Sequence, residues 1–377
     1  MPLRAVLGVD SALTRNLFLT ELLSQIDAAL RFAKEKPNDW FGGIIVIFAG
    51  DFYQYPPVCA TPLYNSIPSY SKTSDSQLAR RLGRLAWKSV NAVLTFTEQK
   101  RMKNDPEYAT AVTHLCTREC TISDVDLFNT RIIKSAAHED GIDMSTDENF
   151  NATAIVPINL LRQTMNLRKA ESNCFRYKLR LTTCAAVDTC STSKLSQKQH
   201  DDLLRLDMSS SKLMDALPGF LPLYVGMPIV LKSKNISTDL GITNGSQGYV
   251  RQFHTNINSM NFTYCSCALI EFPDSRVNLP NLPHGYFPIT PVSTSFVTEL
   301  PQTEYEPKRK VKITRTQLPI QPAFAVTGHS AEGKTLPNVL INLHEGGFGA
   351  YVAALHARSR QGLYITEPVL LSDLNSL

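Results

Sequence analysis

Phe41-Gly-Gly-Ile44-Ile-Val-Ile-Phe48-Ala-Gly50-Asp51-Phe-Tyr-Gln54-Tyr-Pro-Pro-Val58 contains an unbroken apolar run with turn residues on both sides. A short continuous apolar run bounded by glycines is typical of a strand that is buried on both faces, as in a parallel α/β sheet. Ligands of such sheets bind at the carboxyl ends of the strands. We therefore expect a buried strand over 44–48 and a functional loop directly after it, from Asp51 to Gln54.

The sequence on both sides of this stretch alternates between helical and strand patterns. Apolar residues three and four positions apart predict a helix over 18–34, which the turn at 37–39 ends. Asp105-Pro106-Glu107 is a strong helix start, because it combines an N-cap residue, a proline in the first turn and an acid at the positive end of the helix dipole. Further helices are expected from Ser74 or Asp75, from Ser123-Asp124 and over 159–173, and strands over 90–96 and 152–156. This alternation predicts an α/β layer structure for residues 1–175.

The second half of the chain has a different composition. Ser, Lys, Gln and Asp dominate residues 190–216, which predicts a long loop or linker. After Pro218 short apolar segments alternate with turn residues, and Asn244-Gly245 between two of them indicates a β-hairpin. Lys308 to Arg315 is the most basic segment of this β-rich insert and is expected to be a solvated edge strand. The strands expected in this half cover 224–232, 248–253, 264–272, 292–298, 323–327, 339–343 and 362–366.

Length and composition exclude several classes of protein. The chain has 377 residues, of which 43% are hydrophobic, and its 18 Gly and 22 Pro are too few for a collagen-like or globally disordered chain. No apolar stretch approaches the length of about 18 residues that a membrane-spanning helix needs. The formal net charge of +4 is mild, so it permits a nucleic-acid partner without requiring one. The 8 Cys lack the paired spacing of a zinc finger and no apolar signal core precedes them, so we expect free thiols in a reducing compartment, with a zinc site as the minor alternative.

Gly328-His-Ser-Ala-Glu-Gly-Lys-Thr335 fits the spacing of a phosphate-binding loop. Such a loop follows a strand and opens a helix, so that backbone N–H groups and the helix dipole hold the phosphates. A strand is expected before Gly328, but Pro337 interrupts the first turns of a helix that starts near Thr335. A tight glycine turn that places polar groups at a cleft is therefore the favoured interpretation. A stand-alone nucleotide-binding loop is the alternative.

Several blocks of the chain occur in the order found in one family of helicases. Gly50 to Val58, after Phe41-Gly-Gly, resembles the FGG…GDFxQLPPV segment of the Pif family of superfamily-one DNA helicases, including its Helitron-type relatives. Residues 323–335 resemble helicase motif V, and residues 351–358 resemble motif VI. Similar matches lie between these blocks, at Glu98-Gln-Lys-Arg101 with Asp105-Pro-Glu-Tyr108, at Asn159-x-x-Arg162 with Asn166, and at Tyr224 to Asn235 with Asn244-Gly-Ser-Gln-Gly248. The ordered set is far more specific than any single motif.

The resemblance implies an α/β fold, namely a RecA-like P-loop NTPase helicase core with a small β-rich insert. Residues 1–100 would form an incomplete first RecA-like domain, residues 101–217 and 318–377 the second, and residues 218–317 the insert. ATP and Mg²⁺ would bind between the two RecA-like domains, and the motor would move along single-stranded DNA. The resemblance also implies an intracellular, nuclear protein that uses no membrane and no obligate protein partner.

The resemblance further assigns roles to single residues. Gln54 and Arg101 would contact the γ-phosphate or its attacking water, where a guanidinium offsets developing negative charge. The implied catalytic residues are Gln54, Arg101 and His356, and the implied nucleotide-binding residues are Asp51, Gln54, Arg101, Glu332 and Gly333. The implied DNA-binding residues are Phe52, Tyr55, Asn244, Thr327, His329 and Ser330, because small polar groups contact phosphates and aromatic rings stack on bases. The alternatives are a structural hydrogen bond for Gln54, a surface ion pair for Arg101, and core or interface packing for Phe52, Tyr53 and Tyr55.

The chain departs from the family pattern where phosphoryl-transfer chemistry is expected. No Walker A loop precedes Phe41, Asp10 is the one candidate metal ligand near residues 8–11, and Glu332 stands where the family has Gln. Leu355-His356 replaces the Ser-Arg pair of motif VI, and a neutral imidazole cannot supply the permanent forked charge of guanidinium. Because an arginine finger is worth roughly 10³–10⁵ in rate, we expect that the chain alone does not hydrolyse ATP. Two functions follow: a truncated C-terminal portion of an ATP-dependent DNA helicase, or a catalytically dead single-stranded DNA-binding protein or transposon remnant.

Overall fold

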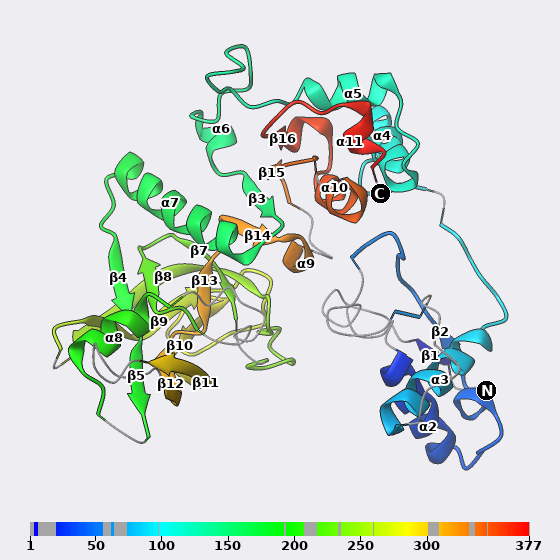
Figure 1. The fold of residues 1–377 in the computed structure, drawn as a ribbon, viewed down its shortest axis with the longest axis horizontal. Helices are drawn as coiled ribbons and strands as arrows, with labels where there is room; N and C mark the ends of the chain where they lie inside the picture. The colour runs from blue at the N-terminus through cyan, green and yellow to red at the C-terminus, as the bar shows by residue number, and fades with distance from the viewer. Residues whose placement is uncertain are drawn as a thin grey trace. The chain divides into compact units, whose positions relative to one another are not determined.

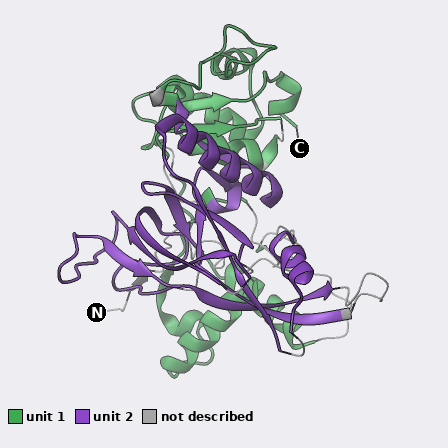
Figure 2. Cartoon of the chain, turned by 90° about the vertical axis from the view of Figure 1, so that its left-hand side faces the viewer, with its two compact units in different colours: residues 1–149, 331–377 green, residues 150–330 purple. Residues whose placement is uncertain are grey.

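The computed structural model divides the chain into two compact units. Residues 1–149 with 331–377 make unit 1, and residues 150–330 make unit 2 (Figure 2). The predicted domain boundaries at 100/101, 217/218 and 317/318 stay a prediction. The residues that the structure describes are 4–6, 20–55, 62–63, 74–96, 98–191, 194–206, 217–232, 235–258, 260–300, 309–331, 336–344 and 346–376.

A small α/β layer makes the N-terminal part of unit 1. Its elements are β1 (Arg4–Val6), α2 (Thr20–Ala33), β2 (Ile45–Ile47) and α3 (Asp75–Lys88). The two strands pair in parallel, and the two helices pack against each other (Figure 1). Ser74 begins α3 with a capping box, as predicted. The helices approach each other closely at Gly83, where a Cβ atom would lie 1.6 Å from the backbone oxygen of Thr20, so a larger residue would push the helices apart.

The turn before β2, Trp40–Gly43, has a left-handed backbone that a buried carboxylate supports. Phe41, Gly42 and Gly43 have φ values of 53°, 63° and 73°. The Oδ1 atom of Asp27 in α2 accepts the Phe41 N–H at 2.6 Å, and its Oδ2 atom accepts from Arg31 at 2.7 Å. Because α2 fixes this turn, the direction in which β2 leaves it is fixed as well.

The structure corrects two predictions for this part of the chain. β2 is a strand, but it is not buried on both faces, because Ile45 and Ile47 are each 49% exposed and β1 is its one strand partner among the described residues. Residues 90–96 are not a strand: none of the described strands pairs with them, and Val93 is 89% exposed. An apolar run becomes a strand only where a neighbouring strand supplies its backbone partners, and local sequence does not contain that information.

The rest of unit 1 combines helices with a second parallel strand pair. α10 packs against α4, and β15 pairs with β16. Asp105 caps α4 as predicted, accepting the Tyr108 N–H at 3.2 Å. α5 follows a capping box at Thr121 and so begins slightly before the predicted Ser123. The elements are α4 (Pro106–Thr117), α5 (Ile122–Asn129), α6 (Asp147–Phe150), β15 (Val339–Ile341), α10 (Gly347–Leu355), β16 (Leu363–Ile365) and α11 (Leu371–Leu374).

The chain after the glycine turn at 328–335 decides between the two interpretations of that turn. Residues 332–335 lie outside the described residues, but residues 336–344 are described and contain no helix. Leu336 instead forms a bridge with Ala357, and β15 follows. A phosphate-binding loop needs a helix that opens at this point. The stand-alone nucleotide-binding loop is therefore wrong.

Unit 2 begins with a strand and a long helix. β3 (Thr153–Val156) pairs in parallel with β14 (Ala325–Thr327), and α7 (Asn159–Tyr177) packs on both. Asn166 of α7 fastens β14: its Nδ2 donates to the Ala325 carbonyl at 3.1 Å, and its Oδ1 accepts the Ala325 N–H at 2.8 Å. The predicted strand and helix are confirmed, although α7 extends beyond the predicted end near Asn173.

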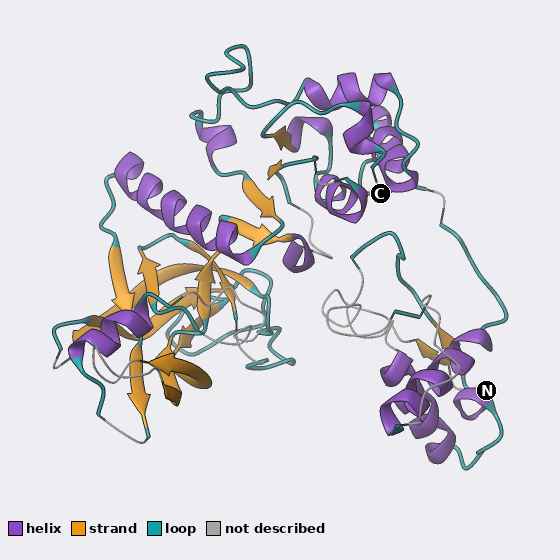
Figure 3. Ribbon diagram, in the orientation of Figure 1, coloured by secondary structure: helices purple, strands orange, loops and turns teal. Residues whose placement is uncertain are grey.

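Strands dominate the rest of unit 2 (Figure 3). Five of them form an antiparallel sheet in the order β10-β9-β8-β7-β13, and β4 pairs with β6. Asn244-Gly245 lies in the connection between β7 and β8, where Gly245 has a φ of 93°, so the predicted hairpin and β-rich insert are confirmed. The strands are β4 (Thr182–Ala185), β6 (Phe220–Leu223), β7 (Pro228–Leu231), β8 (Gln247–Ile257), β9 (Thr263–Glu271), β10 (Tyr286–Ile289) and β13 (Ile320–Pro322).

The basic segment is an edge strand only in its first part. β12 (Arg309–Gln317) lies between β11 (Val292–Leu300) and β5 (Val187–Cys190). Strand alternation exposes Lys310 and Lys312 but turns Arg315 into the interior, where it donates to both carboxylate oxygens of Asp188 at 2.7 Å. β5 pairs with β12 only over residues 313–316, so the prediction is wrong for that part of the strand. It failed there because β5 lies far away in the sequence.

The predicted linker over 190–216 is also wrong in part. α8 (Gln197–Leu204) begins at Ser196 with a capping box and buries Leu203 and Leu204. Polar residues outnumber apolar ones in this segment, so its overall composition did not indicate the helix. Residues 207–216 lie outside the described residues.

No helix in the described part of the chain has the length and apolar character to cross a membrane. The described residues contain no group of three or more His, Cys, Asp or Glu side chains that could hold a metal ion. The cysteines at 116, 120, 174, 184, 265 and 267 are free thiols, as predicted.

Candidate functional site

The loop after β2 is organised around the Asp51 carboxylate. Its Oδ1 atom accepts the Tyr53 backbone N–H at 2.8 Å, and its Oδ2 atom accepts from the Gln54 side-chain amide at 3.4 Å. The hydroxyl of Tyr351, a buried residue of α10, donates to the same Oδ2 atom at 3.1 Å. Asp51 therefore joins the loop that carries Gln54 to α10.

Arg101 contacts the same helix one turn further along. Its guanidinium donates to the backbone carbonyl of Leu355, the last residue of α10, at 2.8 Å. Burial lowers the pKa of Arg101, and the positive charge of Arg358 lowers it further, but a guanidinium stays protonated at neutral pH. The bond to a carbonyl is not the surface ion pair considered for Arg101. Gln54 and Arg101, both predicted to contact phosphate, are thus tied to one rigid element.

His356 follows directly after α10 and is 2% exposed. Its side chain lies in the interior of unit 1 rather than in solvent. A side chain that contacts a transferred phosphate has to project into the site that holds it. Burial therefore counts against the predicted catalytic role of His356, which stays a prediction.

An ion pair ties the start of α4 to the segment after α10. The Arg360 guanidinium contacts both carboxylate oxygens of Asp105, with a shortest distance of 2.6 Å, and also reaches Glu107 at 2.6 Å. The hydrogen bond from Arg360 holds the pKa of Asp105 below its usual range. One carboxylate thus caps α4 and receives Arg360, and the sequence indicated only the first of these roles.

This ion pair predicts a pH-dependent contribution to stability. The Asp105 carboxyl has a lower pKa in the folded chain than in the unfolded one, so its stabilisation is complete above the unfolded value of about 3.9 and is lost as the pH falls through the depressed folded value. We expect Asp105→Asn to cost about 1.5–3 kcal/mol at pH 7. This difference from the wild-type chain should shrink toward pH 3, as measured by urea unfolding at each pH. A difference that stays constant between pH 7 and pH 3 would contradict it.

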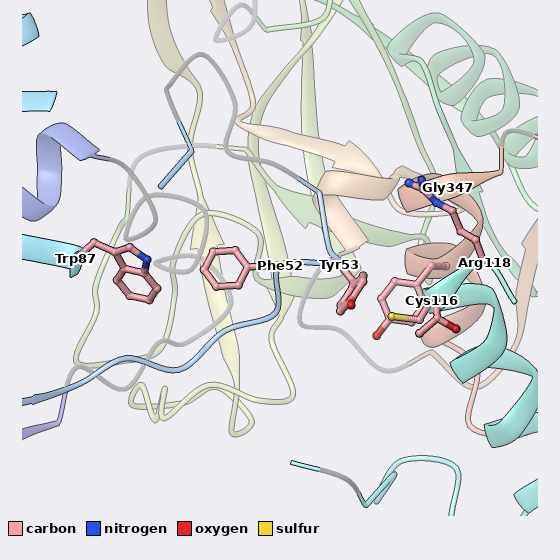
Figure 4. Close-up of a pocket in the computed structure, with 8 residues that line it drawn as sticks. Phe52, Tyr53, Trp87, Cys116, Arg118 and Gly347 are labelled. Carbon is pink, nitrogen blue, oxygen red and sulfur yellow. The ribbon is translucent and has the colours of Figure 1, made fainter. Parts of the chain in front are cut away.

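A pocket of about 440 Å³ lies beside this site in unit 1 (Figure 4). Its lining includes the predicted DNA-binding residue Phe52, whose ring packs edge-to-face on Trp87 with the centroids 5.9 Å apart. Burial raises the pKa of the Cys116 thiol to about 11, so this lining cysteine is a weak nucleophile at neutral pH. The full lining is Phe52, Tyr53, Trp87, Cys116, Thr117, Arg118, Gly347 and Tyr351. Tyr351 lies in the block that resembles motif VI, but sequence analysis gave it no role. It also gave no role in the site to Trp87, Cys116, Thr117, Arg118 and Gly347, which come from helix ends that no motif marks.

Unit 2 carries the remaining predicted DNA-binding residues. Thr327 ends β14, and its hydroxyl donates to the Ser330 hydroxyl at 3.0 Å. His329 lies in the same short helix as Ser330, α9 (Gly328–Ala331), so these three residues share one polar turn. Asn244 lies on the β7–β8 connection, where its backbone N–H donates to the Asn235 side chain at 3.1 Å.

Three predicted site residues have no described placement. Asp10, Glu332 and Gly333 lie outside the described residues, so their roles stay predictions. Tyr55 is described and half-buried in the loop after β2. The amide of Gln54 and the guanidinium of Arg101 are two groups of unit 1 that could hold phosphate oxygens.

Comparison with known proteins places this geometry in context. A scan against models of protein families finds no match. The chain is similar to an ATP-dependent DNA helicase, PIF6, of Trypanosoma brucei brucei, with 26% identity over 356 residues. This match covers 92% of the chain and 38% of the relative, so the chain spans well under half the length of that protein.

Solved structures share the fold. The Pif1 helicase from Candida albicans has a TM-score of 0.61 and 20% identity, covering 97% of this chain and 72% of that one. A Pif1 helicase from Bacteroides, in complex with ADP-AlF3 and single-stranded DNA, has a TM-score of 0.60 and 17% identity, covering 96% of this chain and 73% of that one. These structures confirm the predicted α/β fold with a RecA-like core. The sequence match runs along almost the whole chain and the fold agrees, so the chain is similar to Pif-type DNA helicases in both sequence and fold.

Proposed function

We propose that the chain is part of an ATP-dependent DNA motor that senses ATP through Gln54 and Arg101 and moves along single-stranded DNA. The observation that carries this proposal is α10, which contacts Asp51 through Tyr351 and Arg101 through Leu355. Phosphoryl transfer depends on groups held in a fixed geometry around the phosphate. A single rigid helix that fixes both groups supplies that geometry.

The residues of this site fit a nucleotide phosphate. Arg101 has further N–H groups beyond the one bound to Leu355, and Gln54 offers an amide that can orient a water or a phosphate oxygen. Bound ATP would bring Mg²⁺, which neutralises charge on the phosphates. The candidate metal ligand Asp10 lies outside the described residues.

Single-stranded DNA is the proposed polymer substrate. The turn at Thr327, His329 and Ser330 offers small polar groups of the kind that contact DNA phosphates. Exposed Phe52 can stack on a base without sequence preference. A Bacteroides Pif1 with the same fold was solved with ADP-AlF3 and single-stranded DNA, which supports both ligands. We place this action in the nucleus, in repair, recombination or telomere maintenance, on the family resemblance alone.

The buried His356 favours a second candidate, a single-strand binder that does not hydrolyse ATP. An imidazole lacks the permanent forked charge with which a guanidinium stabilises a transferred phosphate. DNA contacts through unit 2 do not require that chemistry.

One experiment separates the two candidates. The purified chain is assayed for ATP hydrolysis with and without oligo(dT), and for oligo(dT) binding by fluorescence anisotropy at several salt concentrations. DNA-stimulated hydrolysis that Arg101→Ala abolishes supports the motor. Salt-sensitive binding that Thr327→Val weakens, without hydrolysis, supports the binder. If the chain neither binds nor hydrolyses, both proposals fail.

A further inference from the structure

Two buried thiols of unit 2 contact each other across strands that are distant in the sequence. Cys184 lies in β4 and Cys265 in β9, and these two strands pack together (Figure 1). Cys184 is 0% exposed and Cys265 is 2% exposed, and both belong to one hydrophobic core. Their side chains form a hydrogen bond with each other. Sulfur atoms in such contact need only a small movement to reach the bonded distance of about 2 Å in a disulfide.

A β-bulge shapes the surroundings of Cys265. Thr255 of β8 stands opposite Cys265, whereas His254, the residue before it, stands opposite Cys267. One residue of β9 is therefore left over, and an irregularity of this kind re-aims the side chains beside it. The Cys265 sulfur makes hydrogen bonds with the backbone of both His254 and Cys267, and it lies 3.3 Å from the Cys267 carbonyl oxygen. The bulge thus fixes the Cys265 sulfur on the side of Cys184.

The two thiols differ in acidity because of this contact. The hydrogen bond from Cys184 lowers the pKa of Cys265 against the opposing effect of burial, and the backbone hydrogen bonds at the bulge lower it further. The same hydrogen bond raises the pKa of Cys184, and burial raises it as well. Cys265 therefore ionises first, while Cys184 keeps its proton. A thiolate in contact with a thiol is the arrangement from which a disulfide forms.

We propose that Cys184 and Cys265 form a reversible disulfide when the chain meets hydrogen peroxide. The Cys265 thiolate attacks one oxygen atom, the O–O bond breaks, and Cys265 becomes a sulfenic acid. The leaving hydroxide takes up the proton that Cys265 had lost and becomes water. The Cys184 sulfur then attacks the Cys265 sulfur and the S–O bond breaks, so that the departing hydroxide takes the Cys184 proton and leaves as a second water. Two electrons pass from the thiols to the peroxide, and a dithiol reductant restores them.

The disulfide fastens β4 to the five-stranded sheet. The loop that it closes contains β6, β7 and β8, of which β6 pairs with β4 while β7 and β8 belong to the sheet with β9. Closing a long loop stabilises the folded state mainly by restricting the unfolded chain. Hydrogen peroxide is hardly larger than water and reaches the buried sulfur when the ladder opens locally at the bulge. The inference requires neither ATP nor DNA, so it does not rest on the proposed function.

Peptide mapping without reductant tests the proposal. The purified chain is reduced, freed of the reductant, treated with hydrogen peroxide, blocked with iodoacetamide and digested with trypsin. We expect a cross-link between the peptides 181–194 and 252–276, with a mass two hydrogen atoms below the sum of the two peptides. Dithiothreitol should separate the two peptides again.

Matched variants identify the two sulfur atoms. Cys190 and Cys267 lie on the same two peptides as the proposed pair, and Cys190 packs against a different core cluster from Cys184. Cys190→Ala and Cys267→Ala should therefore keep the cross-link. Cys184→Ala and Cys265→Ala should each abolish it, and alanine is chosen because it is small and apolar enough for a buried site.

The thermal midpoint gives a second, independent measurement. Oxidation should raise the midpoint of the wild-type chain by roughly 4–16 °C, as followed by circular dichroism, and dithiothreitol should reverse the rise. Cys190→Ala should show the same rise, and Cys265→Ala should show none. An unchanged midpoint in a chain that carries the cross-link would disprove that the disulfide fastens β4 to the sheet.

The proposal is wrong if the peroxide-treated wild-type chain yields no link between these two peptides. It is also wrong if the link survives both Cys184→Ala and Cys265→Ala, or if Cys265 is oxidised to a sulfonic acid while Cys184 stays reduced. The wild-type chain and the two controls give these answers even where a core variant does not fold. Because no turnover is measured, the chain can fail as a motor and still pass this test.

Discussion

Replacing Asp188 by alanine is expected to lower the free energy of unfolding by about 3–5 kcal/mol. The side chains of Asp188 and Arg315 are both 0% exposed, and the carboxylate is the one negative charge that faces this guanidinium among the described residues. Without it, Arg315 keeps only the carbonyls of Leu203 and Leu217, at 2.6 and 3.2 Å, as hydrogen-bond partners. An uncompensated charge in the interior is among the most costly single changes in a protein.

Equilibrium unfolding in urea, followed by circular dichroism, measures this effect. Glu271→Ala is the matched control, because it breaks the partly exposed pair with Arg251 and should cost less than about 1 kcal/mol. The double replacement of Asp188 by Leu and Arg315 by Met should be milder than Asp188→Ala, since it leaves no charge behind. If Asp188→Ala and Glu271→Ala lower the free energy of unfolding equally, the buried pair contributes no more to stability than the partly exposed pair, and the prediction is wrong.

Replacing Arg101 by alanine is expected to weaken ATP binding by about 10- to 100-fold. Hydrogen bonds from a charged donor to a phosphate contribute about 1.5–3 kcal/mol, and Arg101 is the cation of unit 1 that α10 fixes. Affinity is measured by the anisotropy of a fluorescent ATP analogue. Arg101→Lys should retain part of the affinity for ATP, because lysine keeps the positive charge but cannot donate two parallel hydrogen bonds as a guanidinium does.

Lys100→Ala is the control for Arg101. Lys100 is the neighbouring cation; its side chain is 74% exposed and pairs with Glu98, so its removal should leave affinity unchanged. Arg101→Ala also removes the bond to Leu355, so its thermal midpoint is compared with that of the wild-type chain. A stable Arg101→Ala protein that binds ATP like the wild type would refute the proposed role.

Local signals predicted the local structure well. The caps at Ser74 and Asp105 and the long helix from Asn159 were readable from the sequence, because each depends on residues a few positions apart. The motif order further predicted the similarity to Pif helicases and the fold. The predictions that failed concerned strand pairing, namely which strand lies beside β12 and whether any strand lies beside residues 90–96. Those facts depend on segments that are far apart in the chain.

The candidate site shows the same division. The motifs singled out Gln54 and Arg101 but could not show that α10 ties them together, because Tyr351 and Leu355 lie some 250 or more positions away. Trp87 and Arg118 carry no motif signal, since each is a single residue at a helix end. The ion pair between Arg360 and Asp105 was not predicted, because the position of Asp105 at the start of a helix was already explained by its role as an N-cap.

Asn166 shows what a side chain can do when it stands in for a peptide group. Its amide offers one donor and one acceptor to the backbone of Ala325, so it completes the edge of β14 as a neighbouring strand would. Only asparagine and glutamine carry a side-chain amide, and the glutamine side chain is one carbon too long. In a saturation library, position 166 should tolerate almost nothing, aspartate included, because a carboxylate would face the Ala325 carbonyl. Deamidation of Asn166 would therefore weaken the hydrogen bonds to Ala325 and loosen the strand that leads to Thr327.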